Sequence, residues 1–504
     1  MSEAAIAMNR FGLGARSGEA PPTDARRWLT EQIDHYRPVP PSIAAAPTSA
    51  AVAVDLAAYQ AEQRRIRQSQ GPRAGNRAEA RVTGDPAMAA MPAPAMSGAM
   101  PAMDMAASPG RDAQQEARQF ARRAAQERYA GLVGARTVAA ITSGVPFAER
   151  LVHFWSNHFA VSADKLELIG LSGTLEMEAI RPHVMGRFAD MLFAVERHPA
   201  MLLYLDQAVS IGPDSSVGQR AASRGRRRAG LNENLAREIM ELHTLGVRTG
   251  YSQADVTEFA RAMTGWTVAG IGGGPAARFV ANRPVGTFAF VGEVHQPGSR
   301  TIMGKVYHQH GEAQAQAVLA DLAVHPATAR HVATKLARHF AGDAPPPALV
   351  ARLEAAFLSS VGDLPTVYRA LIASPEAWAP APAKFKTPWE WVVSSYRALG
   401  LTDVPGKGVQ GLMGQLGQPI WKPGQPIGFD DTAASWAAPD AILRRVEAAQ
   451  RFAAKAAPAI DARALAPQLF PASVSPATTQ ALARAESPAQ ALALLLVSPE
   501  MMRR

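Results

Sequence analysis

Apolar residues recur at helical spacing in one segment after another of this 504-residue chain. In residues 250–268, Phe259 and Met263 belong to an apolar stripe that repeats every three or four positions. Ser252 and Asp255 precede the stripe as Ser-x-x-Asp, a capping box that marks the start of a helix. The pattern predicts a mainly α-helical protein.

Changes in composition divide the chain. We expect a large multi-helix body built from an N-terminal helical segment (1–68), a low-complexity disordered insertion rich in Met and Arg (69–110), a helical core (111–269), a glycine-rich loop with a small β insertion (270–307) and a C-terminal helical region (308–504). Asp24 is placed to cap the first clear helix, and a helix is expected from about Asp112 to Leu132. Alternation around Phe288 and Phe290 predicts a β-hairpin.

One segment puts polar side chains where a core should begin. In "LNENLAREIMELHTLGV" (231–247), Leu235 and Ile239 start an apolar stripe. At 100° per residue, the neighbouring sector carries four polar side chains: Asn234, Arg237, Glu238 and Glu241. Arg237 and Glu241 stand four residues apart and should pair. Two readings stay open, namely a hydrogen-bonded packing network and the lining of a pocket in which Asn234, Arg237, Glu238 and Glu241 are catalytic.

Histidines suggest a metal site beside that sector. His158 in "HFWSNHF" and the distant His295 could join Glu238 and Glu241 to bind one divalent metal, Zn, Mn or Fe. The Glu-x-x-His spacing of di-iron helical bundles is absent. On a regular α-helix His243 lies about 200° from Glu241, which excludes His243 from the same face.

A second metal hypothesis concerns the low-complexity insertion. It contains six methionines, and soft thioethers suit Cu(I): Met88, Met91, Met96, Met100, Met103 and Met105. The competing interpretation is compositional drift, because no His or Cys interleaves with them.

Charge and motifs limit the function classes. The formal net charge is +9. Arginines cluster in 64–81 and again directly before the segment 231–247, at Arg224, Arg226, Arg227 and Arg228. Such clusters attract anionic polymers or conjugates, although a solvated basic loop is equally simple. No nucleophile elbow, phosphate-binding loop or His-Glu-x-x-His zinc motif is present, and no specific nucleic-acid binding is expected. The chain has no cysteine, which excludes disulfides and thiolate sites.

Targeting signals are missing from the sequence as written. No basic n-region leads an apolar stretch at the N-terminus, and no run reaches the length of a transmembrane helix. At face value the protein is cytoplasmic.

Several pieces in fixed order resemble the bacterial family called domain of unknown function 1800. They include "RFGLGA", "HFWSNHFAVS", "RHPAMLLYLDQAVS", "HPATARHVATKLARHF", "FKTPWEWVVSSYRALG" and "GQPIWKPGQPIGF", besides the run from Gly230 to Thr267. The resemblance implies a mostly helical, exported protein, and so a periplasmic location, with a sulfatase-like protein as partner. Many members carry Asp after the position of His295, where this chain has Gln296, which weakens a ligand role there.

Three functions follow as hypotheses. The first is an envelope-associated hydrolase, metal-assisted or acid/base, that acts on an anionic polymer or conjugate. The second is a non-catalytic binding or assembly partner of a sulfatase-like protein. The third is copper handling through the methionines.

Overall fold

The computed structural model describes residues 1–69, 109–224 and 230–504. Within these ranges the protein is mainly helical, with two small two-stranded sheets, as the periodicity predicts. The low-complexity insertion lies outside the described residues except at its edges, and so do all six methionines of the copper hypothesis. Arg226, Arg227 and Arg228 are likewise outside.

The elements are given in chain order. The N-terminal region has α1 (Glu3–Ile6), η1 (Ala7–Phe11), α2 (Ala25–Asp34), α3 (Pro41–Ala44) and α4 (Ser49–Ser69). The next region has α6 (Pro109–Thr142), α7 (Pro146–His158), α8 (Leu166–Ile169), α9 (Ser172–Leu175), η3 (Glu176–Ile180), η4 (Arg181–His183), α10 (Phe188–Glu196), α11 (Pro199–Tyr204), η5 (Gln207–Val209) and α12 (Ser216–Ser223). Then follow α13 (Asn234–Glu238), η6 (Ile239–His243), α14 (Gln253–Met263), β1 (Trp266–Val268), η7 (Pro275–Phe279), β2 (Phe288–Phe290), η8 (Gly292–Val294), β3 (Arg300–Ile302) and β4 (Lys305–Tyr307).

The C-terminal region is helical. It has α15 (Glu312–Ala323), α16 (Pro326–Ala341), α17 (Pro347–Ser359), α18 (Leu364–Ala373), η9 (Pro375–Trp378), α19 (Pro388–Ala398), α20 (Gly406–Gln415), α21 (Ala433–Trp436), α22 (Pro439–Ala456), α23 (Ala462–Leu469), α24 (Pro476–Ala483), α25 (Pro488–Leu496) and α26 (Pro499–Met502).

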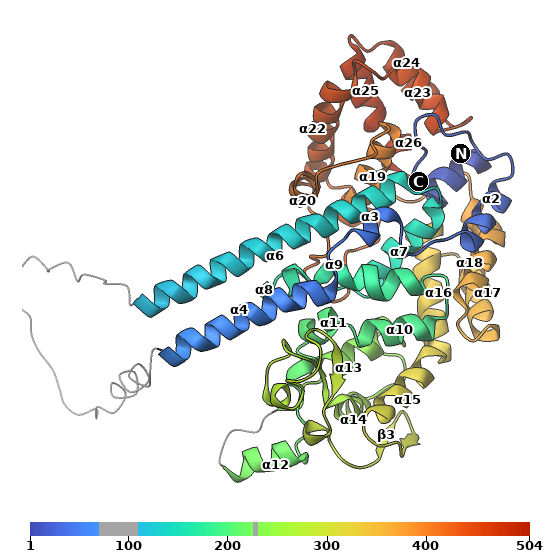
Figure 1. Cartoon of the computed structure of the whole chain (residues 1–504). Helices are drawn as coiled ribbons and strands as arrows, with labels where there is room; N and C mark the ends of the chain where they lie inside the picture. The colour runs from blue at the N-terminus through green and yellow to red at the C-terminus, as the bar shows by residue number, and fades with distance from the viewer. Residues whose placement is uncertain (70–108, 225–229) are drawn as a thin grey trace, which may run out of the picture.

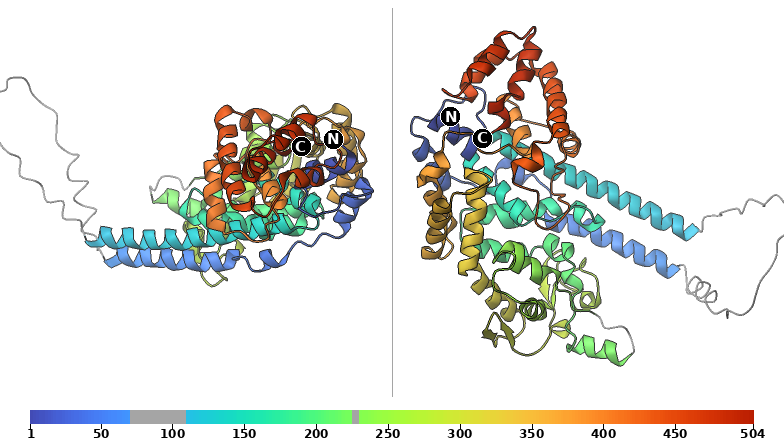
Figure 2. Two further views of the ribbon diagram at one scale, coloured as in Figure 1. Left: turned by 90° about the horizontal axis from the view of Figure 1, so that it is seen from above. Right: turned by 180° about the vertical axis from the view of Figure 1, so that it is seen from behind.

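Helices α4 and α6 form an antiparallel pair that projects from the body (Figures 1 and 2). The helix expected over 112–132 is longer, because buried residues such as Val133, Ala140 and Ile141 continue its apolar stripe into the body. Beyond the body the pair carries exposed side chains, of which Phe120, 72% exposed, is the largest apolar one. By length and composition alone, the stretch 41–69 would also suffice to cross a membrane.

A small hairpin forms within the predicted β insertion, but Phe288 and Phe290 are not part of it. Strand β2 pairs antiparallel with β1, with Phe288 opposite Val268, and the hairpin itself forms later, between β3 and β4. The ring of Phe288 packs edge-on against Trp266 at a centroid distance of 5.2 Å, while Arg197 lies over the Phe288 ring. Trp266, which lies outside the predicted β insertion, therefore favours the pairing of β2 with β1 through its contact with Phe288.

The signature segment 231–247 is not one α-helix. It is the short α13 followed by the π-helix η6, and the Thr244 hydroxyl donates to the carbonyl of Ile239, five residues earlier. A π-helix closes its hydrogen bonds over five residues instead of four, so each residue turns by less than the 100° that an α-helical wheel assumes, and the wheel fails after Glu238. Predicted caps at Asp24 and Ser252/Asp255 are confirmed.

Two large apolar cores meet at the centre of the body. Helices α7 and α16 contribute Trp155, Leu336 and Phe340 to the first core, and α19 contributes Trp391 to the second. His325 begins α16 by accepting a hydrogen bond from the Ala327 N–H through Nδ1, with a proline at the first helical position. The polar faces of α7, α16 and α19 remain between the cores.

Candidate functional site

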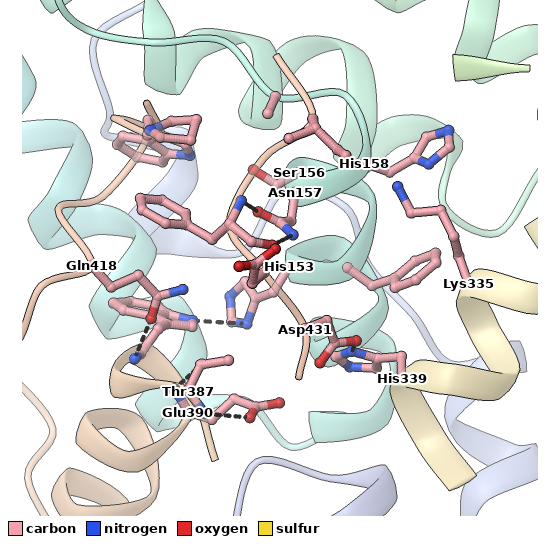
Figure 3. A pocket seen from close by; sticks show the side chains of 18 of the residues that line it. His153, Ser156, Asn157, His158, Lys335, His339, Thr387, Glu390, Gln418 and Asp431 are labelled. Carbon is pink, nitrogen blue, oxygen red and sulfur yellow. Dashed lines mark hydrogen bonds and ion pairs between the residues drawn. The ribbon is translucent and has the colours of Figure 1, made fainter. Parts of the chain in front are cut away.

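A cleft of about 290 Å³ opens between α7, α16, the start of α19 and the loop 416–432 (Figure 3). Its lining is unusually rich in histidine, and the residues that carry the argument are His153, His158, His331, Lys335, Arg338, His339, Glu390, Asp430 and Asp431. The formal charges of the lining cancel. Its four lysine and arginine side chains are matched by four carboxylates: Arg136, Arg150, Lys335 and Arg338 against Glu241, Glu390, Asp430 and Asp431. Its chemistry depends on which of these charges already have partners.

Helix α16 supplies half of the basic side chains that line the cleft. His331, Lys335 and His339 are spaced i, i+4 and i+8, and therefore stand one above another along the helix. The opposite stripe, including Leu336 and Phe340, is fully buried in the core. Burial of that stripe fixes the rotation of α16 and holds the basic face toward the cleft.

Two histidines have matching hydrogen-bond patterns. His158 Nε2 lies 3.1 Å from the carbonyl of His243, and His331 Nε2 lies 3.1 Å from the carbonyl of Leu242. Because a carbonyl only accepts, both Nε2 atoms carry the proton and both Nδ1 atoms have a free lone pair. Burial is the main cause that lowers the pKa of both rings, that of His331 to about 4. Both rings are therefore neutral near pH 7.

Lys335 extends from α16 toward the ring of His158 (Figure 3). Within the described ranges no carboxylate forms an ion pair with its ammonium group, and burial lowers its pKa to about 8. Asp431 opposes that shift at longer range, whereas Arg338 adds to it. The Nζ atom still faces the cavity, so Lys335 brings an incompletely compensated positive charge to the cleft wall.

His339 forms a dyad with Asp431. Its Nδ1 lies 2.9 Å from Asp431 Oδ2, and a carboxylate only accepts, so Nδ1 carries the proton. Among the described residues Nε2 has no hydrogen-bond partner. Burial lowers the pKa of His339 to about 4; burial alone would raise the pKa of Asp431, but the hydrogen bond from His339 and the charge of Lys384 hold that pKa well below its usual range. Near pH 7 the dyad is thus a neutral imidazole with a free acceptor nitrogen, oriented by an ionised carboxylate.

Beneath the dyad lies a buried ion-pair network. Glu390 accepts a hydrogen bond from Arg150 and lies 2.8 Å from Arg504 Nη2. All three side chains are at most 7% exposed, and the two guanidiniums hold the pKa of Glu390 well below its usual value despite burial. The network positions the first turn of α19. Because Glu390 is paired with two arginines, it is not available to a ligand in the cleft.

His153 is a structural residue of the wall. Its Nδ1 accepts a hydrogen bond from Trp389 Nε1, and its Nε2 faces Glu149 Oε1 at 3.5 Å. Nδ1 therefore has a hydrogen-bond partner, whereas the buried Nε2 lies near Glu149 but makes no hydrogen bond among the described residues. Arg136 stacks on Trp389 and Trp421, and covers the ring faces that would otherwise meet the cleft.

The loop 416–432 is fixed to α7 by one amide. The Asn157 side chain donates to the Phe429 carbonyl and accepts from the Phe429 N–H, both at 2.8 Å. At Gly428 an added Cβ would lie 2.3 Å from the Asn157 carbonyl, so only glycine permits this approach. The loop therefore carries Asp431 to His339 in a preformed position.

The predicted catalytic sector disperses. Asn234 is exposed at the start of α13 and Glu238 is half-buried away from the cleft, where burial and repulsion from Glu241 raise its pKa. Arg237 pairs with Glu241 at 3.6 Å, as predicted, but more closely with Glu233 at 3.1 Å. Glu233 in turn accepts hydrogen bonds from α14, which makes Arg237 part of a packing network. Only Glu241 lines the cleft.

The predicted metal set is not brought together. His158 and Glu241 line the same cleft, whereas His295 lies beside the Thr264 carbonyl in the β insertion. In the described ranges no group of three or more His, Asp or Glu side chains is arranged to hold a metal ion. Gln296, in place of the family's Asp, bonds through its side chain to Asp214.

Sequence reasoning excluded His243 from Glu241's face, and the two do diverge. It gave no role to His331, Lys335 and His339, although all three stand in "HPATARHVATKLARHF", or to Asp431, which lies two residues after "GQPIWKPGQPIGF". The i, i+4, i+8 spacing in "HVATKLARH" was a readable signal of a basic face. The contact of His339 with Asp431 joins residues 92 apart and had no local signal.

Comparison with curated proteins and with solved structures gives no match. The family described as protein of unknown function, DUF1800, matches residues 6–503, which include every element of the cleft. The chain therefore belongs to the DUF1800 family.

Proposed function

We propose that the cleft is the active site of an acid/base hydrolase acting on an anionic conjugate. The observation that carries the proposal is the arrangement on α16: an incompletely compensated Lys335 stands one turn from a His339–Asp431 dyad whose Nε2 is buried and has no hydrogen-bond partner among the described residues. The envelope location implied by the family resemblance is retained as part of the proposal.

Lys335 and Arg338 are the groups suited to hold the anion. A charge-assisted hydrogen bond from a partly desolvated ammonium is stronger than one between neutral groups. The rings of His158 and His331 stand close enough to feel the Lys335 charge, and because both rings are neutral they add no positive charge of their own. The Lys335 charge also disfavours a dication at these two rings, which argues for an anion rather than a metal there.

His339 is suited to act as general base. Its Nε2 would take a proton from a water molecule, whose oxygen attacks the electrophilic centre of the conjugate. The ionised Asp431 would stabilise the imidazolium, which then returns the proton to the leaving oxygen as its bond breaks. Glu241, on the opposite wall and paired with Arg237, is a secondary candidate for contact with substrate.

The test is a panel of chromogenic phosphate, sulfate and carboxylate esters with the purified protein. Turnover of at least one ester that is lost in His339→Asn and in Asp431→Asn supports the proposal. His310→Asn, at an exposed histidine outside the cleft, is the matched control. Turnover that survives in both dyad variants, or no turnover of any ester class, would count against it.

A second candidate function is that of a non-catalytic assembly partner. The projecting pair of helices α4 and α6 supports it. A groove lined by apolar residues such as Leu56, Tyr59 and Phe120 runs along it, far from the cleft elements. If His339→Asn and Asp431→Asn left cellular function intact while Phe120→Ser abolished it, the protein would be an assembly partner and not a hydrolase.

A further inference from the structure

Two aliphatic side chains stand exposed on the rim of the cleft. Val247, 56% exposed, follows the π-helix η6, and Ile427, 53% exposed, lies in the loop 416–432; both line the cavity. Leu242, half-buried, lines it beside Val247. Single exposed aliphatic residues are ordinary on protein surfaces. Three aliphatic side chains that line one cavity together with a lysine and histidines are a more specific arrangement.

Both rim residues are held in place. Ile427 directly precedes Gly428 and the Asn157–Phe429 clamp, so loop packing keeps the Ile427 side chain at the mouth. Gly246, with φ of +94°, packs against the His331 ring and sets the position of Val247. The apolar rim is therefore a preformed feature.

The size of the cavity limits what it can enclose. A volume of about 290 Å³ is at the lower end of the roughly 300–1,000 Å³ typical of small-molecule sites. It fits a compact anionic head group, and any longer part of the ligand must leave across the rim. That exit passes Val247, Leu242 and Ile427.

The type of apolar side chain distinguishes between conjugates. Saccharides usually stack on open aromatic faces, but Trp389 and Trp421 are at most 7% exposed and covered by Arg136. Phe429 is a half-buried aromatic side chain of the lining, whereas the apolar side chains with the larger exposed fractions, Val247 and Ile427, are aliphatic and suit an alkyl or acyl chain.

We propose that the ligand of the cleft is an anionic amphiphile, with its head group at Lys335 and one apolar chain lying across Val247, Leu242 and Ile427. This inference rests on the proposed function, because it takes Lys335 as the anion site. It adds the substrate class: a phosphate or sulfate ester, or a carboxylate, that carries a hydrocarbon chain.

The test compares ethyl phosphate with decyl phosphate by isothermal titration below the micelle concentration. We expect decyl phosphate to bind at least about ten-fold more tightly, because several buried CH₂ groups each contribute. Ile427→Ser and Val247→Ser should each weaken decyl phosphate by about five-fold and leave ethyl phosphate unchanged. Leu443→Ser and Val54→Ser, at equally exposed positions outside the cleft, are the matched controls and should change neither.

The outcomes separate the two proposals. If ethyl phosphate and decyl phosphate bind with equal affinity, and Lys335→Met binds neither, the ligand is not an amphiphile but the anion site stands. Decyl phosphate binding that survives Lys335→Met would overturn both. Vesicles distinguish the source: release of bound decyl phosphate by vesicles of phosphatidylcholine with phosphatidic acid beyond that by phosphatidylcholine alone identifies a membrane lipid, and equal release identifies a free amphiphile.

Discussion

The signature segment 231–247 and the face of α16 contrast in how visible they are from the sequence and in what they do. The segment displays its polar residues openly, yet Arg237 mainly ties α13 to α14 through Glu233. The face of α16 shows three basic residues in an ordinary amphipathic helix, yet it lines the cleft. A recognisable motif can thus stabilise packing while the chemistry lies on a neighbouring helix.

The largest difference between the two regions is expected in catalysis, when the dyad of the cleft is changed. His339→Asn should lower kcat/KM for a substrate of the cleft by about 10²–10⁴-fold, because the general base is lost. Glu238→Gln, in the signature segment, should change kcat/KM by less than about three-fold. Steady-state kinetics on both variants measures the difference, and equal losses would remove the distinction between the two regions.

The next effect concerns stability. Glu390→Gln leaves Arg150 and Arg504 buried with a weaker partner, and should lower the free energy of unfolding by about 3–5 kcal/mol. Glu241→Gln breaks a partly exposed pair and should cost below about 1 kcal/mol. Urea unfolding of both variants tests this contrast, and a cost for Glu241→Gln as large as that for Glu390→Gln would refute it.

A third prediction uses pH. The folded-state pKa of His331 is about 4, below its ordinary 6.5, so the unfolded chain binds more protons between these values. Stability should therefore be retained above about pH 6.5 and fall as the pH drops toward about 4, by on the order of 3 kcal/mol from His331. His331→Gln should flatten this part of the stability curve, as chemical denaturation across the range would measure. An unchanged slope would mean that His331 is not buried neutral.

The smallest effect is expected at Asn234. Its side chain is exposed and makes no hydrogen bond within the described residues, so Asn234→Ala should change stability by about 0.5 kcal/mol or less. A thermal melt beside that of Glu241→Gln measures it. A loss of several degrees would contradict the exposed, uninvolved position of the Asn234 side chain.

Much of the fold could be predicted from sequence, and much of the site could not. Periodicity and caps such as Asp24 and Ser252 are local, so the helical class and several starts are confirmed. The π-turn at Ile239–His243 has no reliable local signal, and it invalidated the helical wheel after Glu238. The β1–β2 pairing and the His339–Asp431 contact depend on tertiary packing, which one sequence read alone does not contain.

The central claim is that Lys335 makes the cleft an anion site. Isothermal titration with inorganic phosphate tests it most directly, on the wild type, Lys335→Met and the exposed control Lys407→Met. Because the pKa of Lys335 is about 8, we predict one bound anion at about pH 6.5 and loss of binding by about pH 9.5. Lys335→Met should weaken binding at least about ten-fold, and Lys407→Met should not. Equal phosphate affinity in wild type and Lys335→Met would contradict the account.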